Sequence, residues 1–498
     1  MKKTLAIILS AIMVLSMGIT SFAAETDYAI TNPYADVDWD TYSAYKADLH
    51  SHTIASDGSN TTKEMAERHY ELGFDIYAQS DHGTVNSSWT EKDSYDPAIK
   101  FIMMIKEGIA PIVTLDREGT AENGKTYTVT TVDGDDYYAQ EGGHTMMRVP
   151  FANEQNPTSF NNAHVNTWFV DWGHGRIGGT SDYATPISAV DELGGLSVIN
   201  HPGEYTSARD VLTTEEAYSE AKFGYYIDKF ENILMTYDSC IGIDINSKGD
   251  SRTRFDRKLW DTMLTDLAPA GRNDFAIAST DAHNLGIVDS GYIMAMMPEL
   301  TSAALKEALS SGAFFAQSCY CGNTDELVAY SEALLASDNA AAVALGEQMK
   351  AVADNNLAEI ANGDNGGQYR FAEGAECTEV TSIAVDDAED TITINAENAL
   401  YIRWISDDGV VVAEGNSIDL DECENIGSYV RAEIISEGAV TYTQAFLLNY
   451  DGMPEADYDE NFTDKDTVLF AAIDEFLRGL ASIISVFAAP MLKLFGVV

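Results

Sequence analysis

Two histidines with one residue between them, His50 and His52, are the first residues of the chain whose types and spacing could bind a metal ion. On a β-strand, alternate side chains point to the same side, so both imidazole rings can reach one ion. An acidic turn, Asp57-Gly58, follows and can bring a carboxylate to the same place. The histidine pair alone is weak evidence, because unrelated histidines also occur at this spacing. With the acidic turn, it indicates a metal site.

Three later segments place further candidate ligands directly after short apolar runs that are typical of strands. These candidates are His82, His201 and the pair Asp281 and His283. In α/β barrels, side chains at the carboxyl ends of the strands gather at one face. Ligands that are remote in sequence then become neighbours in space, so the four segments together predict one metal site.

The elements that must position these residues form an α/β pattern over residues 42–320, where short apolar strands alternate with helix-like stretches. This alternation favours parallel strands with connecting helices. Residues 325–370 are Ala-rich with helical periodicity and predict a helical insertion or linker. Over residues 376–450, short strands with frequent turns predict a small β-sandwich-like unit. Residues 467–498 are apolar on one face at helical spacing and predict an amphipathic tail helix.

The four ligand segments, in this order and in these strand contexts, resemble the four motifs of the PHP superfamily, named for polymerase and histidinol phosphatase domains. The resemblance covers roughly residues 42–317. It implies a distorted (β/α)7 barrel with two or three divalent metal ions at its mouth. Residues 308–316, followed by a small β-unit, look like the secreted carbaryl-hydrolase-like branch of this superfamily.

The same resemblance implies a bridging glutamate and a further histidine between the second and third motifs. Glu154, followed ten residues later by His164, is the best match, and Glu118 is the competing bridge. Neutral imidazoles and carboxylates suit Zn, Mn or Fe. The implied ligands are His50, His52, Glu154 and Asp281 for a first ion, Glu154, His164 and His201 for a second, and Asp57, His82 and His283 for a third.

Other polar residues near these motifs have predicted supporting roles. Asp48 and Asp81 stand close to candidate ligand histidines, and we expect them to orient these ligands without binding the metal ion themselves. His69 lies on a predicted helix, residues 62–72, and is expected at the surface. His174 is a candidate substrate contact or general acid.

The composition restricts the class of substrate. Asp and Glu number 80 against 29 Lys and Arg, which gives a net charge of −51 at pH 7. Such a field repels nucleic acids and anionic surfaces, so no nucleic-acid partner is expected. A small anion can still bind where metal ions reverse the local field. Arg148 and Arg209 are candidate phosphate contacts, and the alternative interpretation is that both are surface arginines.

The two ends of the chain carry apolar segments. Residues 1–24 combine a basic start, an apolar run and a small-residue cleavage site, as in a secretory signal peptide, with an uncleaved membrane anchor as the alternative. The protein is therefore expected to be secreted, in a compartment where Cys377 and Cys423 could form a disulfide. The longest uncharged run of the tail, residues 479–492, is too short to span a bilayer. The tail is expected to contact a membrane surface or a partner, or to pack on its own protein.

These observations predict a secreted metal-dependent hydrolase in which a metal-bound hydroxide attacks the substrate. The leading hypothesis is a phosphoesterase acting on a small extracellular phosphoester. A carbamate or amide hydrolase with the same metal site, which the carbaryl-hydrolase-like branch implies, is the second. A cell-surface binding protein with a structural metal site is the third. No Ser/His/Asp nucleophile motif, P-loop or dinucleotide fingerprint is visible in the sequence.

Overall fold

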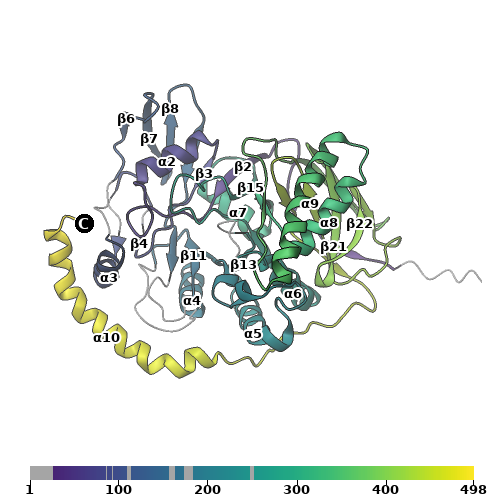
Figure 1. The fold of residues 1–498 in the computed structure, drawn as a ribbon. Coiled ribbons are helices and arrows are strands. Elements are labelled where there is room, and N and C mark those ends of the chain that lie inside the picture. Colours follow the sequence, from purple (N-terminus) through teal and green to yellow (C-terminus); the bar gives the residue numbers. More distant parts are fainter. Residues whose placement is uncertain are drawn as a thin grey trace, which may run out of the picture.

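The computed structural model describes residues 26–85, 87–91, 94–108, 114–155, 163–172, 183–246 and 252–497. The architecture is mixed α/β, and two sheets carry the candidate ligands while helices lie along their flanks (Figure 1). The predicted signal peptide, residues 1–24, lies outside the described residues.

The larger sheet has fourteen strands, and those from the N-terminal part of the chain are, in spatial order, β6 (Glu118–Thr120), β7 (Thr126–Val132), β8 (Asp135–Gln140), β9 (Thr145–Arg148), β3 (Ile76–Tyr77), β2 (Ser43–Asp48), β15 (Gly291–Met297) and β16 (Phe314–Ser318). Strands β2, β3 and β9 are parallel to one another, whereas β15 and β16 continue the sheet in antiparallel fashion. Strand β2 becomes fully buried at its C-terminal end, so the segment that carries His50 and His52 begins inside the protein.

The second sheet has five strands, in the order β10 (Asn153–Gln155), β11 (Val165–Trp168), β12 (Leu196–Ile199), β13 (Cys240–Asp244) and β14 (Phe275–Ile277). The last three strands are parallel, as the sequence predicts. Strand β11 is antiparallel to both of its neighbours. The short connection between β10 and β11 explains this direction, because a parallel crossover needs a dozen or more residues.

The two sheets meet at two places but do not form one continuous sheet within the described residues. The chain passes directly from β9 to β10, and an isolated parallel bridge joins Ser51 to Ala282 beyond the ends of β2 and β14. Backbone hydrogen bonds cross both junctions, from the Glu154 amide to the Ser80 carbonyl oxygen at 2.9 Å and from the His52 amide to the Ala282 carbonyl oxygen at 2.8 Å, and a closed (β/α)7 barrel stays a prediction. The carboxyl ends of β2, β3, β12 and β14 nevertheless face one common region.

Helices with clear end signals connect these strands. For example, the first helix begins with a capping box between Thr61 and Glu64, and the second has the N-cap Asp96 and ends at the left-handed Gly108. The helices of this part are α2 (Thr62–Glu71), α3 (Pro97–Glu107), α4 (Ala184–Leu193), α5 (Glu220–Thr236), α6 (Asp256–Leu267) and α7 (Ser302–Ser311), with the short 3-10 helices η1 (Pro202–Glu204), η2 (Ala208–Asp210) and η3 (Ala268–Ala270). A small hairpin, β4 (Thr84–Val85) with β5 (Ser94–Tyr95), precedes α3.

The C-terminal strands are not a separate sheet system. Strand β25 pairs with β16, so β1 (Ala29–Thr31), β21 (Tyr401–Ser406), β22 (Val410–Glu414), β24 (Tyr429–Ile435), β25 (Val440–Tyr442) and β26 (Phe446–Asn449) all belong to the sheet that contains β2. A three-stranded sheet stands apart, made of β19 (Glu379–Asp386), β20 (Thr391–Glu397) and β23 (Ser417–Asp419). Buried residues of both sheets, such as Ile392 and Val430, share one hydrophobic cluster. The predicted β-unit is therefore continuous with the N-terminal region.

The Ala-rich region forms two helices, α8 (Thr324–Leu335) and α9 (Ala340–Ala361), which pack on each other in front of the C-terminal strands (Figure 1). The short strands β17 (Tyr320–Cys321) and β18 (Tyr369–Arg370) pair at their base, and η4 (Asp407–Gly409) lies between β21 and β22. The expected disulfide is not formed, because Cys377 and Cys423 are both free thiols. The Sγ of Cys377 instead accepts a hydrogen bond from the Tyr292 hydroxyl.

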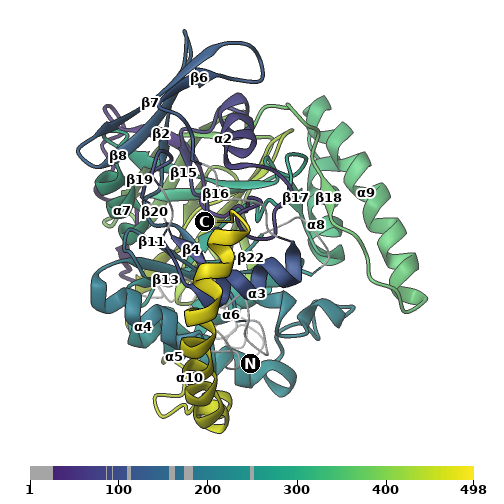
Figure 2. The ribbon, with the colours of Figure 1, turned by 90° about the vertical axis from the view of Figure 1, so that its left-hand side faces the viewer.

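The tail forms one long helix, α10 (Lys465–Leu494), which follows the outer edge of the molecule (Figure 1). Its C-terminal end lies against α3 (Figure 2), where Leu492 and Val497 form a small apolar cluster with Ile99 and Met103. In the part of the chain that the structure describes, no helix is both long and apolar enough to cross a membrane.

Candidate metal centre

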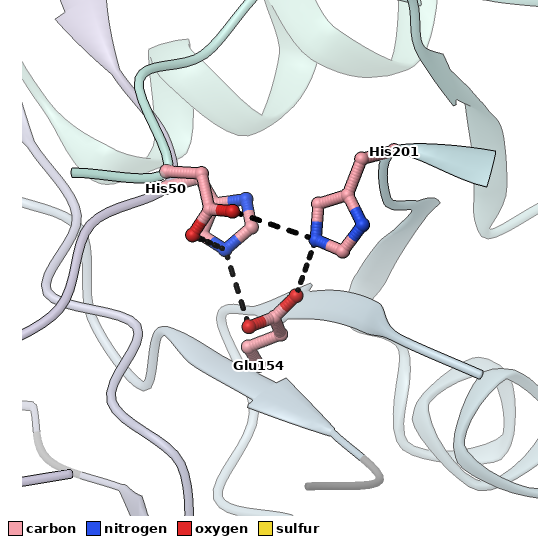
Figure 3. A group of neighbouring side chains, drawn as sticks. His50, Glu154 and His201 are labelled. Carbon is pink, nitrogen blue, oxygen red and sulfur yellow. Dashed lines mark hydrogen bonds and ion pairs between the residues drawn. The ribbon is translucent and has the colours of Figure 1, made fainter. Parts of the chain in front are cut away.

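Glu154, the middle residue of β10, directs its carboxylate toward His50 and His201 (Figure 3). The side chain is fully buried, and each of its two oxygens faces imidazole nitrogens from different segments of the chain. The contacts are Oε1 to His164 Nδ1 at 3.0 Å and to His201 Nε2 at 3.1 Å, and Oε2 to His52 Nε2 at 3.2 Å and to the Nε2 atoms of His50 and His82 at 3.3 Å. Its two oxygens face different histidines, which is compatible with the bridging role that the family resemblance implies.

Asp281 supplies a second buried carboxylate on the opposite side of the histidine pair. Its Oδ1 lies 3.1 Å from His52 Nε2 and 3.3 Å from His50 Nε2, and its Oδ2 lies 3.7 Å from His201 Nε2. The Nε2 atoms of His50 and His52 are themselves only 3.1 Å apart, as the alternating directions of an HxH segment predict. Two imidazoles and two carboxylates thus converge on one point.

A third group lies nearer the surface. Asp57 Oδ2 is 3.4 Å from His283 Nε2 and 3.9 Å from His82 Nε2, and Asp57 Oδ1 is 3.5 Å from His52 Nδ1. Gly58 permits this turn, because a Cβ at that position would lie 2.6 Å from the carbonyl oxygen of His52. The glycine is therefore required for the close approach of the Asp57 segment to His52.

The structure brings all nine predicted ligands together. Several of them belong to more than one group of neighbouring ligand atoms, which the sequence does not imply. Ligand atoms that lie within 4.8 Å of one another form four overlapping groups, namely His50 with Glu154, His201 and Asp281, His52 with Asp281 and His283, His52 with Asp57 and His82, and His82 with Glu154 and His164. His201 belongs to the group of His50, and it also shares Glu154 Oε1 with His164, as the family resemblance pairs them. The donor set and its burial suit divalent metal ions.

The backbone is strained at two of these ligands. His201 has φ 28° and Asp281 has φ 44°, which are values that residues with a side chain rarely adopt. Such strain persists only where the surrounding structure enforces it, and it gathers at functional sites. After His201, the Gly203 amide donates to buried Asp256 Oδ1 at 2.9 Å, which fixes the sharp turn at the end of β12.

The buried side chains differ in how strongly a proton competes with a metal ion. Burial lowers the pKa of His82 to about 3, and its Nδ1 contacts the Glu154 carbonyl oxygen at 3.0 Å, which leaves Nε2 free to act as a ligand. Burial alone would raise the pKa of Glu154, but His164, His50 and His82 hold it well below its usual range. Burial likewise opposes the positive charge of His52, yet Asp57 and Glu154 raise its pKa, so a metal ion at His52 would displace a proton.

Asp81 organises the loop between the histidine pair and Asp57. It accepts hydrogen bonds from the Thr53 amide at 2.7 Å, from Ser56 Oγ at 2.6 Å and from Gln79 Nε2 at 2.7 Å. Ser56 Oγ in turn lies 3.3 Å from His52 Nδ1. Asp81 therefore acts on the ligand through Ser56, which is the supporting position that the sequence predicts for it.

The expectation that His69 lies at the surface is wrong. His69 is fully buried, with Nε2 at 2.9 Å from Asp48 Oδ2 and Nδ1 at 2.8 Å from the Met65 carbonyl oxygen. Asp48 also accepts a hydrogen bond from the His50 amide at 3.1 Å. His69 occupies the face of α2 that packs on the sheet, so it supports the backbone of the first ligand through Asp48.

A cavity of about 180 Å³ opens at the centre. Besides six of the predicted ligands, it is lined by Met103 and Lys106 of α3 and by Glu204 and Tyr205. The Tyr205 hydroxyl lies 3.1 Å from His164 Nδ1, and burial raises the pKa of Tyr205 far above its usual value, so the phenol stays protonated. Tyr205 follows His201 by four residues on the same turn, a proximity that could have indicated it. No sequence signal marks Lys106.

Neither arginine proposed as a phosphate contact lines this cavity. Arg148 is buried on β9, where its NH1 group donates to Gln79 Oε1 at 3.3 Å. Arg209 is exposed and lies 3.6 Å from Asp210. Arg148 is therefore not a surface arginine, whereas Arg209 agrees with the surface alternative, and a phosphate contact of either residue stays a prediction.

The two remaining candidates from the sequence are Glu118, the competing bridge, and His174, the candidate substrate contact or general acid. Glu118 is exposed on β6 at the edge of the larger sheet, whereas its rival Glu154 occupies the centre. His174 lies outside the described residues.

No family model and no curated protein matches this chain. Three solved structures are similar to it at low identity. A two-domain protein containing a predicted PHP-like metal-dependent phosphoesterase from Bacteroides vulgatus ATCC 8482 is 13% identical, with 83% of this chain and 88% of that chain covered and a TM-score of 0.34. The lesion-specific endonuclease PfuEndoQ from Pyrococcus furiosus is 11% identical, with 54% and 56% covered and a TM-score of 0.30. PsfC from Pseudomonas syringae PB-5123 is 11% identical, with 53% and 88% covered and a TM-score of 0.31. Similarity at this level carries no conclusion about activity, which is argued from the site alone.

Proposed function

We propose that this protein is a metal-dependent hydrolase of the PHP type, which uses two or three divalent ions to hydrolyse a small phosphoester outside the cell. The observation that carries the proposal is the buried carboxylate of Glu154 in contact with five imidazoles, directly beside a cavity. Bound divalent ions lower the pKa of a coordinated water to near neutrality and polarise the scissile group.

The charges around the cavity support an anionic substrate only when metal ions are present. The carboxylates of Asp57, Glu154, Glu204 and Asp281 line it together with the single ammonium of Lys106. Without cations this field repels an anion, and with two or three divalent ions it attracts one. The substrate's binding is therefore tied to the metal content.

The size of the cavity supports a small reacting group. A volume of about 180 Å³ is below the roughly 300–1,000 Å³ of sites that enclose a drug-sized ligand. A phosphoryl group fits it, and the leaving group would extend outward past Lys106 and Met103 on α3. The Tyr205 hydroxyl, held beside His164, is placed to donate a hydrogen bond to a group bound in the cavity.

Two assays in parallel, one with an aryl phosphate and one with an aryl carbamate, test the proposal and its rival. The parent should turn over the phosphate, and the variant His50→Ala should lose both this activity and bound metal. His144→Gln is the matched control, because His144 stacks on Tyr70 outside the centre. Turnover of only the carbamate would favour the carbamate or amide hydrolase. A folded, metal-loaded parent without either activity would favour a binding protein with a structural metal site.

We also propose that the mature protein is secreted after loss of residues 1–24 and that α10 lies on a membrane surface. Large apolar side chains along this helix face solvent, with Phe476, Ile483, Phe487 and Leu494 between 60% and 81% exposed. A contiguous apolar stripe of this kind marks a binding surface. The net charge of −51 favours zwitterionic rather than anionic lipid.

Co-sedimentation with phosphatidylcholine vesicles tests the membrane contact. The full chain should pellet with the vesicles, and the double variant Phe476→Ser/Phe487→Ser should stay in solution. If the parent self-associates without binding vesicles, the partner of α10 would be a second copy of the chain rather than a membrane surface. The mass of the protein recovered from the culture medium reports whether residues 1–24 are removed.

A further inference from the structure

The last turn of α10 ends in a Schellman cap that buries two apolar side chains. The Val497 amide donates to the Leu492 carbonyl oxygen at 3.0 Å, and the Gly496 amide donates to the Lys493 carbonyl oxygen at 3.1 Å. Gly496 has φ 67°, the left-handed conformation that this cap requires. Leu492 and Val497 are 0% and 4% exposed, whereas Leu494 between them is 81% exposed. The cap therefore directs a specific pair of side chains inward at the end of an otherwise solvent-facing apolar stripe.

This inward pair packs on α3, where Ile99 and Met103 complete the apolar cluster (Figure 2). Among the helices and strands that the structure describes, α10 is the only one that packs extensively on α3. The Lys100 ammonium of α3 also donates to the carbonyl oxygen of Ala55, in the loop that leads to Asp57. Two contacts therefore place α3, one with the end of α10 and one with the loop of a candidate metal ligand.

The helix α3 in turn forms one wall of the cavity at the metal centre. Met103 belongs both to the apolar cluster and to the lining of the cavity, and Lys106 lines it three residues later, on the same side of the helix. Lys106 carries the only ammonium or guanidinium group among the described residues that line the cavity. Neither residue is a candidate metal ligand, so α3 contributes to the part of the cavity that a substrate would contact.

We propose that Lys106 contacts a phosphoryl oxygen of the substrate, and that Leu492 and Val497 are positioning residues that hold α3 where this contact can form. The inference rests on the proposed function, because it assigns substrate binding at the same site. An ammonium and a phosphoryl oxygen form a charge-assisted hydrogen bond, which is stronger than one between neutral groups. If α10 leaves α3, the ammonium loses its place at the cavity and the substrate binds more weakly. The metal ligands lie on other elements, so the metal ions stay bound.

Calorimetric titration of the metal-loaded full chain with inorganic phosphate tests the contact. Lys106→Gln, which removes the charge, should bind phosphate about tenfold more weakly than the parent. Leu492→Asp, which puts a charge into the apolar cluster, should weaken binding by a similar factor. The double variant should bind no more weakly than Lys106→Gln, because both changes remove the same contact. Val486→Asp is the matched control and should bind like the parent, since it adds the same charge to α10 at a residue that is 69% exposed. Equal binding by Leu492→Asp and the parent, or additive losses in the double variant, would overturn the proposal.

Metal analysis and steady-state kinetics separate this positioning role from the hydrolase function itself. With an aryl phosphate as substrate, Leu492→Asp should raise KM about tenfold, change kcat little and keep the metal content of the parent. The conservative variant Leu492→Met should keep the KM of the parent. If Leu492→Asp does not fold, Leu492→Ala takes its place, and an unchanged KM in that folded variant would equally contradict the proposal. A parent without metal and turnover contradicts the proposed function, whereas an active, metal-loaded parent whose KM does not respond to Leu492→Asp contradicts only this inference.

Discussion

Replacement of Glu154 by glutamine should remove the metal ions while it leaves the fold in place. Glutamine keeps the shape of the side chain but removes the negative charge, and it turns an amide nitrogen toward imidazoles that now face a carboxylate oxygen. Loss of a residue that only supports a ligand lowers metal affinity about 10–100-fold. Glu154 contacts five histidines directly, so we expect the upper end of this range or more, about 2.7 kcal/mol per ion.

The catalytic effect should exceed the effect on binding. Removal of the bridging carboxylate disturbs both groups of ligands that share it, and we expect kcat/KM to fall about 10³-fold, which corresponds to about 4 kcal/mol of transition-state stabilisation. The variant should keep the circular dichroism spectrum of the parent, since the side-chain volume is unchanged.

Competition with a chelator, followed by steady-state kinetics at saturating metal, measures the two effects separately. Glu118→Gln is the matched control, because it makes the same chemical change at an exposed position on β6. The control should retain metal and activity. If Glu154→Gln held metal as tightly as the parent, or if Glu118→Gln lost it, the bridging role assigned to Glu154 would be refuted.

Three further perturbations test other parts of the structure. His69→Ala removes one of the hydrogen-bond partners of buried Asp48, which keeps the amides of His50 and Thr280. We expect a loss of about 1–3 kcal/mol in the free energy of unfolding, measured by urea denaturation; an unchanged free energy would argue against a supporting role of His69. Gly58→Ala would push a Cβ to within 2.6 Å of the His52 carbonyl oxygen, so metal analysis should show fewer ions per chain, and an unchanged count would show that the turn can relax. Two arginines lower the pKa of buried Glu433 to about 2 from 4.5, so its stabilising contribution is complete above about pH 4.5 and is lost as the pH falls toward 2. That contribution is at most about 3 kcal/mol, and the pH dependence of stability in Glu433→Gln should lack it.

Most of the candidate ligand residues could be found from the sequence because they follow a strand. An apolar run followed by histidine or aspartate places the side chain at a strand end, and the ends of neighbouring strands meet. His50, His52, His201 and Asp281 all follow this rule. Glu154 does not follow an apolar strand; the family resemblance implied a bridging glutamate, and His164, ten residues further on, favoured Glu154 over Glu118.

The residues near the site that the sequence analysis missed depend on contacts between segments that are far apart in the chain. His69 sits among charged neighbours on α2, and only the packing of that helix on the sheet makes it a buried partner of Asp48. Lys106 reaches the cavity because α3 lies beside it, and the C-terminal end of α10 packs against α3. Helical periodicity indicates which face is apolar but not which element will cover it.

The arrangement of the C-terminal strands illustrates the same limit for the fold. Short strands with turns were recognisable over residues 376–450, but the pairing of Ala316 with Tyr442 that joins them to the larger sheet links segments more than a hundred residues apart. The antiparallel direction of β11 likewise depends on the length of its connection to β10 rather than on any strand pattern.

Elemental analysis of the purified, folded protein tests the central claim most directly. The proposed centre predicts two or three Zn, Mn or Fe ions per chain, which a chelator removes together with the activity and which added metal restores with it. Less than one such ion per folded chain, after supply of all three metals, would contradict the assignment of His50, His52 and Glu154 as metal ligands.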